Sequence, residues 1–255
     1  NECKFYSIQK SLDNFDPSEC DASIKYAKEK GAIYRGHALF WPHYNPEWFK
    51  TYSTNVEDNK AVIIDYITKI LDHYKDEESI AYWDVLNECV KDDSDGDHVN
   101  LRVGDNSADY YLGWDTYPED IFTLAREHTN PNVKLCYNDY YNDGFNKTKT
   151  DAVYSFVKSL KQKDLVDCVG LQMHNSCEIA PNYDQLYEVI SRYESIGVEV
   201  HLTEMDISMK KCKSYEDQRK FYNDAFKACF DHSNCKVYTL WGLYDAESWI
   251  GEKYE

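Results

Sequence analysis

The sequence predicts an α/β fold, a (β/α)8 TIM barrel, from three observations. Six short apolar segments read as strands, and a segment with helical periodicity precedes each of them. The strands are nearly continuous apolar runs, as is typical of parallel strands that are buried on both faces. No glycine-rich phosphate loop follows a strand, which disfavours an open doubly wound sheet. The length of 255 residues fits one barrel, so we expect a single domain over residues 1–255.

The helices and strands are predicted in strict alternation. The first helix should start at Asp16-Pro17, a capping residue followed by proline, and end at Gly31. The next helix covers 62–74, where apolar residues recur at helical spacing, and the polar run 91–107 is expected to be a surface loop. The predicted strands are 32–40, 80–88, 133–141, 166–174, 198–207 and 235–243, and the later helices are 119–128, 151–162, 184–195 and 216–230.

The charge of the chain excludes some partners. A formal net charge of -18 would repel both a nucleic-acid backbone and an anionic membrane surface, so we expect no nucleic acid and no membrane as partner. No apolar run approaches the ~20 residues of a membrane span, and no signal peptide is recognised. The chain starts at Asn1 without Met, which indicates a processed or cut chain. We also expect a monomer.

The nine cysteines indicate an oxidising compartment. No CxxC pair is present, which disfavours a zinc ribbon. Cys229 and Cys235 bracket a short loop that a disulfide could close, and Cys177 and Cys212 follow two successive strands and could also meet. For the second pair, buried free thiols are an equally good interpretation. The odd total implies a free thiol or a partner outside this sequence.

One glycosylation motif agrees with that compartment. Asn146-Lys147-Thr148 is a sequon for N-linked glycosylation, a weak signal alone but consistent with secretion. We therefore expect a secreted, extracellular protein.

Polar residues gather at the carboxyl ends of the predicted strands, where barrel enzymes collect their catalytic groups. A structural network of buried polar residues is the alternative, but six strand ends rarely coincide in this way. These residues are His37 and Trp41, Asn87 and Glu88, Asn138 to Tyr140, Gln172 and His174, Glu204 and Asp206, and Trp241.

Two glutamates at the ends of different strands can flank a scissile glycosidic bond. A hydrogen-bonded His174 between Glu204 and Asp206 would hold Glu204 ionised as a nucleophile. Glu88, with aromatic and amide neighbours and no adjacent basic residue, should stay protonated and act as the acid. Cleavage with retention needs the two carboxyl groups roughly 5 to 5.5 Å apart.

A metal site is the rival interpretation of the same strand ends. His37, His174, Glu88 and Glu204 could supply ligands, but no HxH or HExxH spacing exists, and the neighbouring Trp and Gln suit a sugar better. We therefore expect no metal and no organic cofactor.

Six collinear stretches resemble glycoside hydrolase family 10, the endo-β-1,4-xylanases, over essentially the whole chain. The stretches are YRGHALFW, WDVLNE, LCYNDYY, VGLQMH, VEVHLTEMDIS and TLWGLYDAESW. The resemblance implies a retaining endo-1,4-β-xylanase that acts on xylan or xylo-oligosaccharides by double displacement, with Glu88 as acid/base and Glu204 as nucleophile. His174 and Asp206 would then orient the nucleophile.

The resemblance also implies substrate-binding residues. The sugar contacts would come from Asn87 to the 2-hydroxyl, Gln172, His174 and His37 at the cleaved bond, Tyr140 on the aglycone side, Trp241, Trp249 and Trp41 on the glycone side, and Asn1 and Lys4 at the next sugar out. Taken singly, Trp41 could be core, Lys4 a solvated charge and His37 a packed histidine.

The sequence departs from the family pattern in three respects. Pro42-His43-Tyr44 replaces the usual His-Ser-Gln, and Cys89 replaces a small Ala beside the acid. The family barrel also has two strands before the Asn-Glu-x-Lys stretch and a helix after the Ser-Trp block, so the implied barrel lacks its first two strands and last helix. A β-glucanase or cellulase on the same scaffold and a non-catalytic xylan-binding remnant remain as alternatives.

Overall fold

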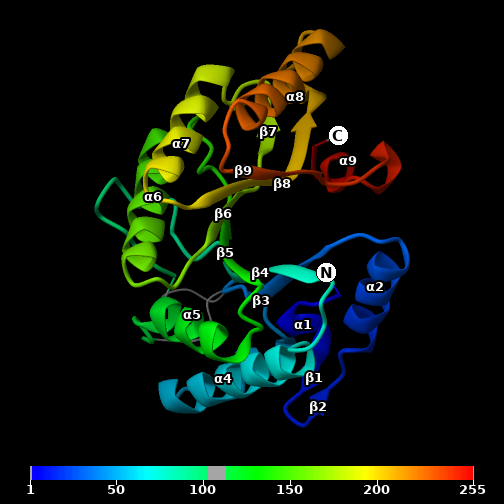
Figure 1. The fold of residues 1–255 in the computed structure, drawn as a ribbon, viewed down its shortest axis with the longest axis vertical. Coiled ribbons are helices and arrows are strands. Elements are labelled where there is room, and N and C mark those ends of the chain that lie inside the picture. Colours follow the sequence, from blue (N-terminus) through cyan, green and yellow to red (C-terminus); the bar gives the residue numbers. More distant parts are fainter. Residues whose placement is uncertain (1, 103–112, 255) are drawn as a thin grey trace. The chain divides into compact units, whose positions relative to one another are not determined.

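The computed structural model describes residues 2–102 and 113–254, and the chain divides into two compact units. The first unit comprises Asn1–Lys91, Asn100–Tyr137 and Gln162–Val166, and the second comprises Asp92–Val99, Asn138–Lys161 and Asp167–Glu255. In both units helices alternate with parallel strands (Figure 1), as the sequence predicts, and the first unit adds a short antiparallel pair formed by residues 9–11 and 14–15. The single domain over residues 1–255 stays a prediction.

The first unit is built on the parallel pair β3 and β4. Gly36 on β3 lies opposite Trp83 on β4, and a Cβ at Gly36 would come within 2.1 Å of the Trp83 ring, so only glycine fits there. The elements are α1 (Phe5–Ile8), β1 (Gln9–Ser11), β2 (Asn14–Phe15), α2 (Ser18–Glu29), β3 (Tyr34–Phe40), α3 (Glu47–Lys50), α4 (Val56–His73), β4 (Ile80–Asn87), α5 (Tyr117–His128) and β5 (Lys134–Asp139), whose last two residues belong to the second unit.

Helix boundaries differ from the sequence prediction where the first turn is polar. Helix α4 starts at Val56, six positions before the apolar periodicity, because Asn55 caps it by accepting a hydrogen bond from the Glu57 backbone N–H at 2.9 Å. Helix α2 starts at Ser18 rather than at Asp16-Pro17, and the Asp16 carboxylate accepts from the Ser18 N–H. None of the helices in residues 2–102 and 113–254 has both the length and the apolarity needed to cross a bilayer.

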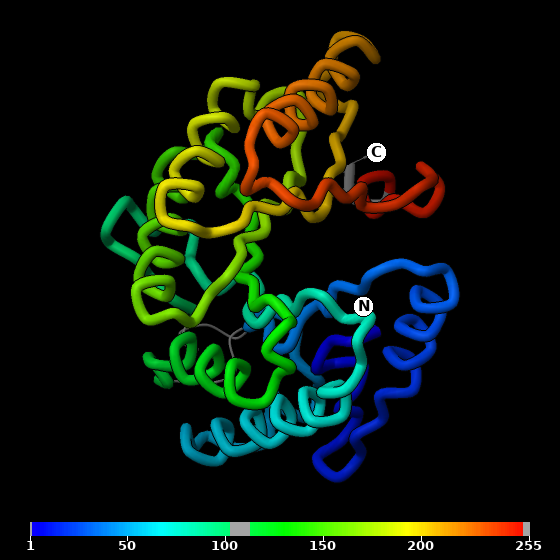
Figure 2. The backbone as a smooth tube through the Cα atoms, viewed as in Figure 1, coloured from blue at the N-terminus to red at the C-terminus, as the bar shows by residue number. Residues whose placement is uncertain are grey.

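The second unit is organised around β8, whose residues are all buried after Glu199. Its first half pairs in parallel with β6 and β9, and its second half with β7. The chain from β8 through α8 to β9 runs from yellow to red in Figure 2. The elements are α6 (Lys147–Gln162), β6 (Cys168–Leu171), β7 (His174–Ser176), α7 (Tyr183–Ser195), β8 (Glu199–Ser208), η1 (Met209–Lys211), α8 (Tyr215–Phe230), β9 (Cys235–Leu240), η2 (Asp245–Glu247) and α9 (Trp249–Tyr254).

Two of the predicted strands need correction. The predicted strand 166–174 is divided, because Met173 has a φ of 64° in the left-handed region and turns the chain between β6 and β7. Strand β9 is not buried like the others, and Leu240 is 49% exposed. Among the strands of the described residues β9 pairs with β8 alone, so it lies at an edge.

Most of the polar run 91–107 lies at the surface as far as residue 102, as predicted, but Ser94 and Arg102 are buried. Residues 103–107 lie outside the described residues. Leu101 of this run forms an isolated antiparallel bridge with Val90, which precedes the run, and Asp95 forms another with His98. Asp92 and Asp93 are exposed.

The structure confirms both predicted disulfides, Cys177–Cys212 and Cys229–Cys235. It adds Cys3–Cys20, which ties the first residues to the start of α2 across 17 positions and which no cysteine spacing predicted. Cys89 is buried and takes part in no disulfide, in agreement with the odd cysteine count.

Replacement of Gly170 on β6 should destabilise the second unit. A Cβ there would lie 2.0 Å from Asn138 Oδ1 and 3.0 Å from Thr203 Cγ2, so Gly170→Ala should lower the free energy of unfolding by about 1 to 3 kcal/mol. Urea denaturation measures the loss. Gly251→Ala is the matched control, because nothing lies within 4 Å of that position, and an equal effect of the two substitutions would contradict the packing argument.

Candidate active site

His174 bridges two carboxylates at the end of β8. Its Nε2 lies 3.0 Å from Glu204 Oε2, and its Nδ1 lies 2.9 Å from Asp206 Oδ1. The contact between His174 Nδ1 and Asp206 Oδ1 is an ion pair, because its geometry is not that of a hydrogen bond. Glu204 and Asp206 sit two positions apart on one strand and therefore point to the same side, and His174 is paired with Asp206 across the β7–β8 ladder. The predicted His between two carboxylates is confirmed.

These contacts make His174 a cation at neutral pH. Burial by itself would lower the pKa of the imidazole, but its pairing with Asp206 and Glu204 outweighs burial and raises the pKa from 6.5 to about 9. The side chains of Glu204 and Asp206 are only 7% and 9% exposed, so solvent screens the pairing little. The positive charge favours the ionised form of Glu204, which a nucleophile needs.

Asn138 holds the other oxygen of Glu204. Its Nδ2 donates to Glu204 Oε1 at 2.8 Å, and its own Oδ1 accepts from Thr203 Oγ1 at 2.8 Å. All three side chains are buried, and Gly170 leaves the space that the Asn138 amide occupies. Both oxygens of the Glu204 carboxylate are therefore fixed, which orients the group for attack in one direction.

Aromatic side chains surround His174. Trp249 Nε1 donates to Asp206 Oδ2 at 2.6 Å, and the Trp249 ring meets the His174 ring edge to face at 5.0 Å between centroids. The Trp241 ring lies 5.9 Å from His174 and is 38% exposed. Two of the three tryptophans expected to contact sugar on the glycone side, Trp241 and Trp249, thus lie at the carboxylate pair.

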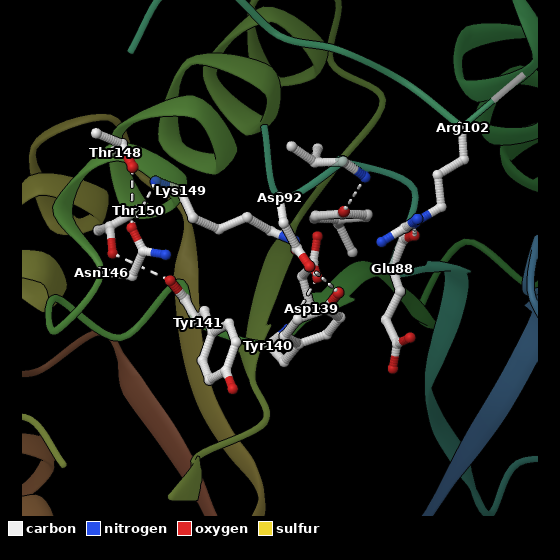
Figure 3. Close-up of polar contacts among 12 residues, drawn as sticks. Glu88, Asp92, Arg102, Asp139, Tyr140, Tyr141, Asn146, Thr148, Lys149 and Thr150 are labelled. Carbon is white, nitrogen blue, oxygen red and sulfur yellow. Dashed lines mark hydrogen bonds and ion pairs between the residues drawn. The ribbon is translucent and has the colours of Figure 1, made fainter. Parts of the chain in front are cut away.

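In the first unit, Glu88 directly follows β4 and has a φ of 56° in the left-handed region that few non-glycine residues adopt. Trp41 Nε1 donates to Glu88 Oε2 at 3.0 Å. The expectation of no adjacent basic residue is wrong, because Arg102 Nε donates to the Glu88 backbone carbonyl at 2.9 Å (Figure 3). Asn87, the last residue of β4, is 1% exposed.

Lys4 belongs to the same group of residues. It is only 6% exposed, and its ammonium lies 4.7 Å from the centroid of a Trp41 ring and 4.9 Å from that of Tyr44, which stack on each other. The interpretation of Lys4 as a solvated charge is therefore wrong. Trp41 is half-buried rather than core, and its N–H is directed at Glu88.

Asp84 is a buried carboxylate that the sequence analysis did not select. His37 Nδ1 and Arg35 Nε each lie 2.9 Å from Asp84 Oδ2. Burial would raise the pKa of Asp84, but the charges and hydrogen bonds of Arg35 and His37 lower it overall. His37, in the middle of β3, is thus held by a hydrogen bond to the neighbouring strand β4, as expected for a packed histidine. The only sequence signal was one acid within an apolar run.

The remaining predicted residues occupy separate places. Tyr140 follows β5 and is half-buried, and Gln172 follows β6 and is 3% exposed, with its backbone carbonyl accepting from the Glu204 N–H at 3.0 Å. Asn146 lies before α6 on the surface of the second unit. Asn1 lies outside the described residues.

The donor chemistry does not favour the metal alternative. A histidine must be neutral to bind a metal ion, whereas both nitrogens of His174 face carboxylates and its pKa is raised to about 9. This removes the central ligand from the proposed set.

Alternating helices and parallel strands with carboxylates near the strand ends are typical of α/β barrel proteins. Similarity to known proteins narrows this class to one family. The profile of glycosyl hydrolase family 10 matches residues 1–255. The endo-1,4-beta-xylanase B of Neocallimastix patriciarum is 37% identical over 252 residues, which cover 98% of this chain and 28% of that protein.

Solved structures agree with the profile. The native xylanase 10B of Thermotoga maritima aligns with a TM-score of 0.88 and 28% identity, and xylanase 10B of Thermotoga petrophila RKU-1 in complex with xylobiose aligns with 0.87 and 27%. Each alignment covers 100% of this chain and 76% of the other. The chain belongs to glycosyl hydrolase family 10 and has the (β/α)8 barrel fold of that family. It spans about a quarter of the length of the Neocallimastix relative.

The charge on His174 predicts a pH dependence of stability. Because the folded pKa is raised from 6.5 to about 9, the stabilisation is fully present below pH 6.5 and is lost as the pH rises through 9. Between pH 6 and 10, the wild type should lose about 2 to 3 kcal/mol of unfolding free energy relative to His174→Gln. Urea denaturation across this range measures the difference.

The surface variant His73→Gln is the control and should follow the wild-type profile. If wild type and His174→Gln showed parallel profiles between pH 6 and 10, the ion pairing of His174 would be contradicted.

Proposed function

We propose that this chain carries the catalytic residues of an endo-acting β-1,4-xylanase that cleaves with retention. The observation that supports this most is the Glu204 carboxylate, held by His174 on one oxygen and by Asn138 on the other. A buried carboxylate kept ionised beside an imidazolium suits a nucleophile that attacks an anomeric carbon. The similarity to xylanase 10B of Thermotoga petrophila RKU-1, whose structure is a complex with xylobiose, supports a xylose-based substrate.

In this mechanism Glu88 protonates the leaving oxygen while Glu204 attacks. The bond between the anomeric carbon and the leaving oxygen breaks, and an ester bond forms to Glu204. Glu88, now a carboxylate, takes a proton from a water molecule whose oxygen attacks the anomeric carbon. The ester bond to Glu204 breaks, which releases the sugar and restores the Glu204 carboxylate and the protonated Glu88. The Trp41 N–H on Glu88 orients the acid. The separation of the two carboxyl groups, about 5 to 5.5 Å in retaining enzymes, stays a prediction.

The binding roles follow the same proposal. Trp241 and Trp249, beside His174, would provide stacking faces for sugars on the glycone side, and Lys4 with Trp41 would bind further along. Asn87 would bind the 2-hydroxyl, and His37 and Gln172 would line the cleaved bond, with Asn1 at the next sugar. We propose a secreted monomer, in keeping with the three disulfides described and with the sequon at Asn146.

Activity assays test the two glutamates. The wild type should release reducing sugar from xylan, Glu204→Ala should release none above a blank, and Glu88→Gln should be about 10² to 10⁴-fold slower because it loses the acid. Glu216→Gln, an exposed acid on α8, is the control and should match the wild type. A folded wild type no faster than Glu204→Ala would contradict the proposal.

The same assay separates the alternatives. Faster release from carboxymethyl cellulose than from xylan would favour a glucanase on this scaffold. Binding of xylo-oligosaccharides without any rise in reducing ends would favour a non-catalytic protein.

The stereochemistry of the first product tests double displacement. Proton NMR recorded early in the hydrolysis of a xylo-oligosaccharide should show the β-anomer, because two inversions restore the configuration. The α-anomer should appear only later, through mutarotation. An α-anomer at the earliest times would exclude Glu204 as nucleophile.

A further inference from the structure

Lys149 is a fully buried lysine in the first turn of α6, outside the carboxylate site described above. Its side chain has 0% exposure, although lysine is seldom buried unless it is paired. The ammonium lies 2.7 Å from Asp92 Oδ1 and 3.4 Å from Asp139 Oδ1 (Figure 3). Asp139 is also fully buried, whereas the Asp92 side chain is 54% exposed. A buried cation thus joins the end of β5 to the surface segment after β4.

The same groups hold the ring of Tyr140. The Lys149 ammonium lies 4.2 Å from the centroid of the Tyr140 ring, within cation–π range. The Tyr140 hydroxyl donates to Asp92 Oδ2 at 2.9 Å, so Asp92 pairs with both Lys149 and Tyr140. The Tyr140 backbone N–H donates to Asp139 Oδ1 at 2.8 Å. The ring is therefore held at its face, its hydroxyl and its backbone.

Local contacts fix the position of Lys149 itself. Its backbone N–H donates to Asn146 Oδ1 at 3.2 Å at the start of α6. The neighbouring Thr150 accepts from the Gly144 N–H at 3.1 Å and donates to the Tyr141 carbonyl at 3.4 Å. Figure 3 shows Tyr141, Asn146, Lys149 and Thr150 gathered around the turn that follows β5. The helix start is therefore anchored to the segment that carries Tyr140.

We propose that Lys149 is a positioning residue that holds the Tyr140 ring, through Asp92, as the platform for a xylose unit on the leaving-group side. This inference rests on the proposed function and adds a residue to it. A ring that is already immobile loses little freedom when a sugar stacks on it, so its fixed position favours binding. Lys149 acts through Tyr140 and does not itself touch substrate.

Two variants disturb the platform without removing the ring. Lys149→Met removes the charge at similar length, and Asp92→Ala removes the shared acceptor at a half-exposed position where folding is less at risk. For both, KM for xylotetraose should rise about tenfold with little change in kcat. Efficiency on 4-nitrophenyl β-xylobioside, whose leaving group needs little binding, should fall only about twofold. Tyr140→Ala should show the same pattern, and adding Lys149→Met to it should cause no further loss.

Matched controls come from the same segments. Lys147→Met removes an exposed lysine two positions earlier, and Asp97→Ala removes an acid from the same surface segment. Both should match the wild type. Equal losses on the two substrates in both Lys149→Met and Asp92→Ala, or no loss in either, would overturn the proposal and indicate a structural role.

A second readout does not depend on activity. The ring signals of Tyr140 in NMR spectra, assigned with Tyr140→Phe, should shift in Lys149→Met and Asp92→Ala but not in the two controls. Unchanged signals would overturn the proposed positioning. A wild type that hydrolyses neither substrate but shows these shifts would instead contradict the proposed function.

Discussion

The chemistry of the second unit depends on one interaction, the pairing of the His174 imidazolium with the carboxylates of Glu204 and Asp206. Glu204 and Asp206 point to the same side of β8, and two buried carboxylates so placed would repel each other without a cation between them. The histidine supplies that cation, and its own pKa rises as a result. One ring thus stabilises the strand end and keeps a nucleophile ionised. The hydrogen bond from Asn138 then fixes the orientation of the Glu204 carboxylate.

Two other buried carboxylates in the chain are also paired with a cationic side chain. Asp84 is balanced by Arg35 from the neighbouring strand, and Asp139 by Lys149 from the following helix. Removing one partner from such a pair leaves an uncompensated charge in a poorly solvated place, which is costly. These pairs therefore restrict the side chains in the middle of β4 and at the end of β5. Rigid strand ends are what a site requires when it must place reacting groups within fractions of an ångström.

Much of the fold and of the nucleophile's setting could be predicted from the sequence. Apolar runs located β4 and β8, and a Glu-x-Asp pair after a buried run pointed to a strand end with chemical use. The break at Met173 could not be predicted, because no glycine marks its left-handed backbone. Lys149 gave no signal either, because a lysine in a polar first turn normally faces water, and only tertiary packing reveals that it is buried.

Covalent trapping tests the central claim most directly. A 2-deoxy-2-fluoro-β-xylobioside with a good leaving group should inactivate the protein. The fluorine slows both formation and hydrolysis of the glycosyl-enzyme, but the good leaving group speeds formation alone, so the covalent species accumulates. Mass spectrometry of the digested protein should then find one sugar on the peptide that contains Glu204, and none on that peptide in Glu204→Ala. A label on another carboxylate, or turnover without any covalent species, would contradict the account of Glu204 as a nucleophile held by His174.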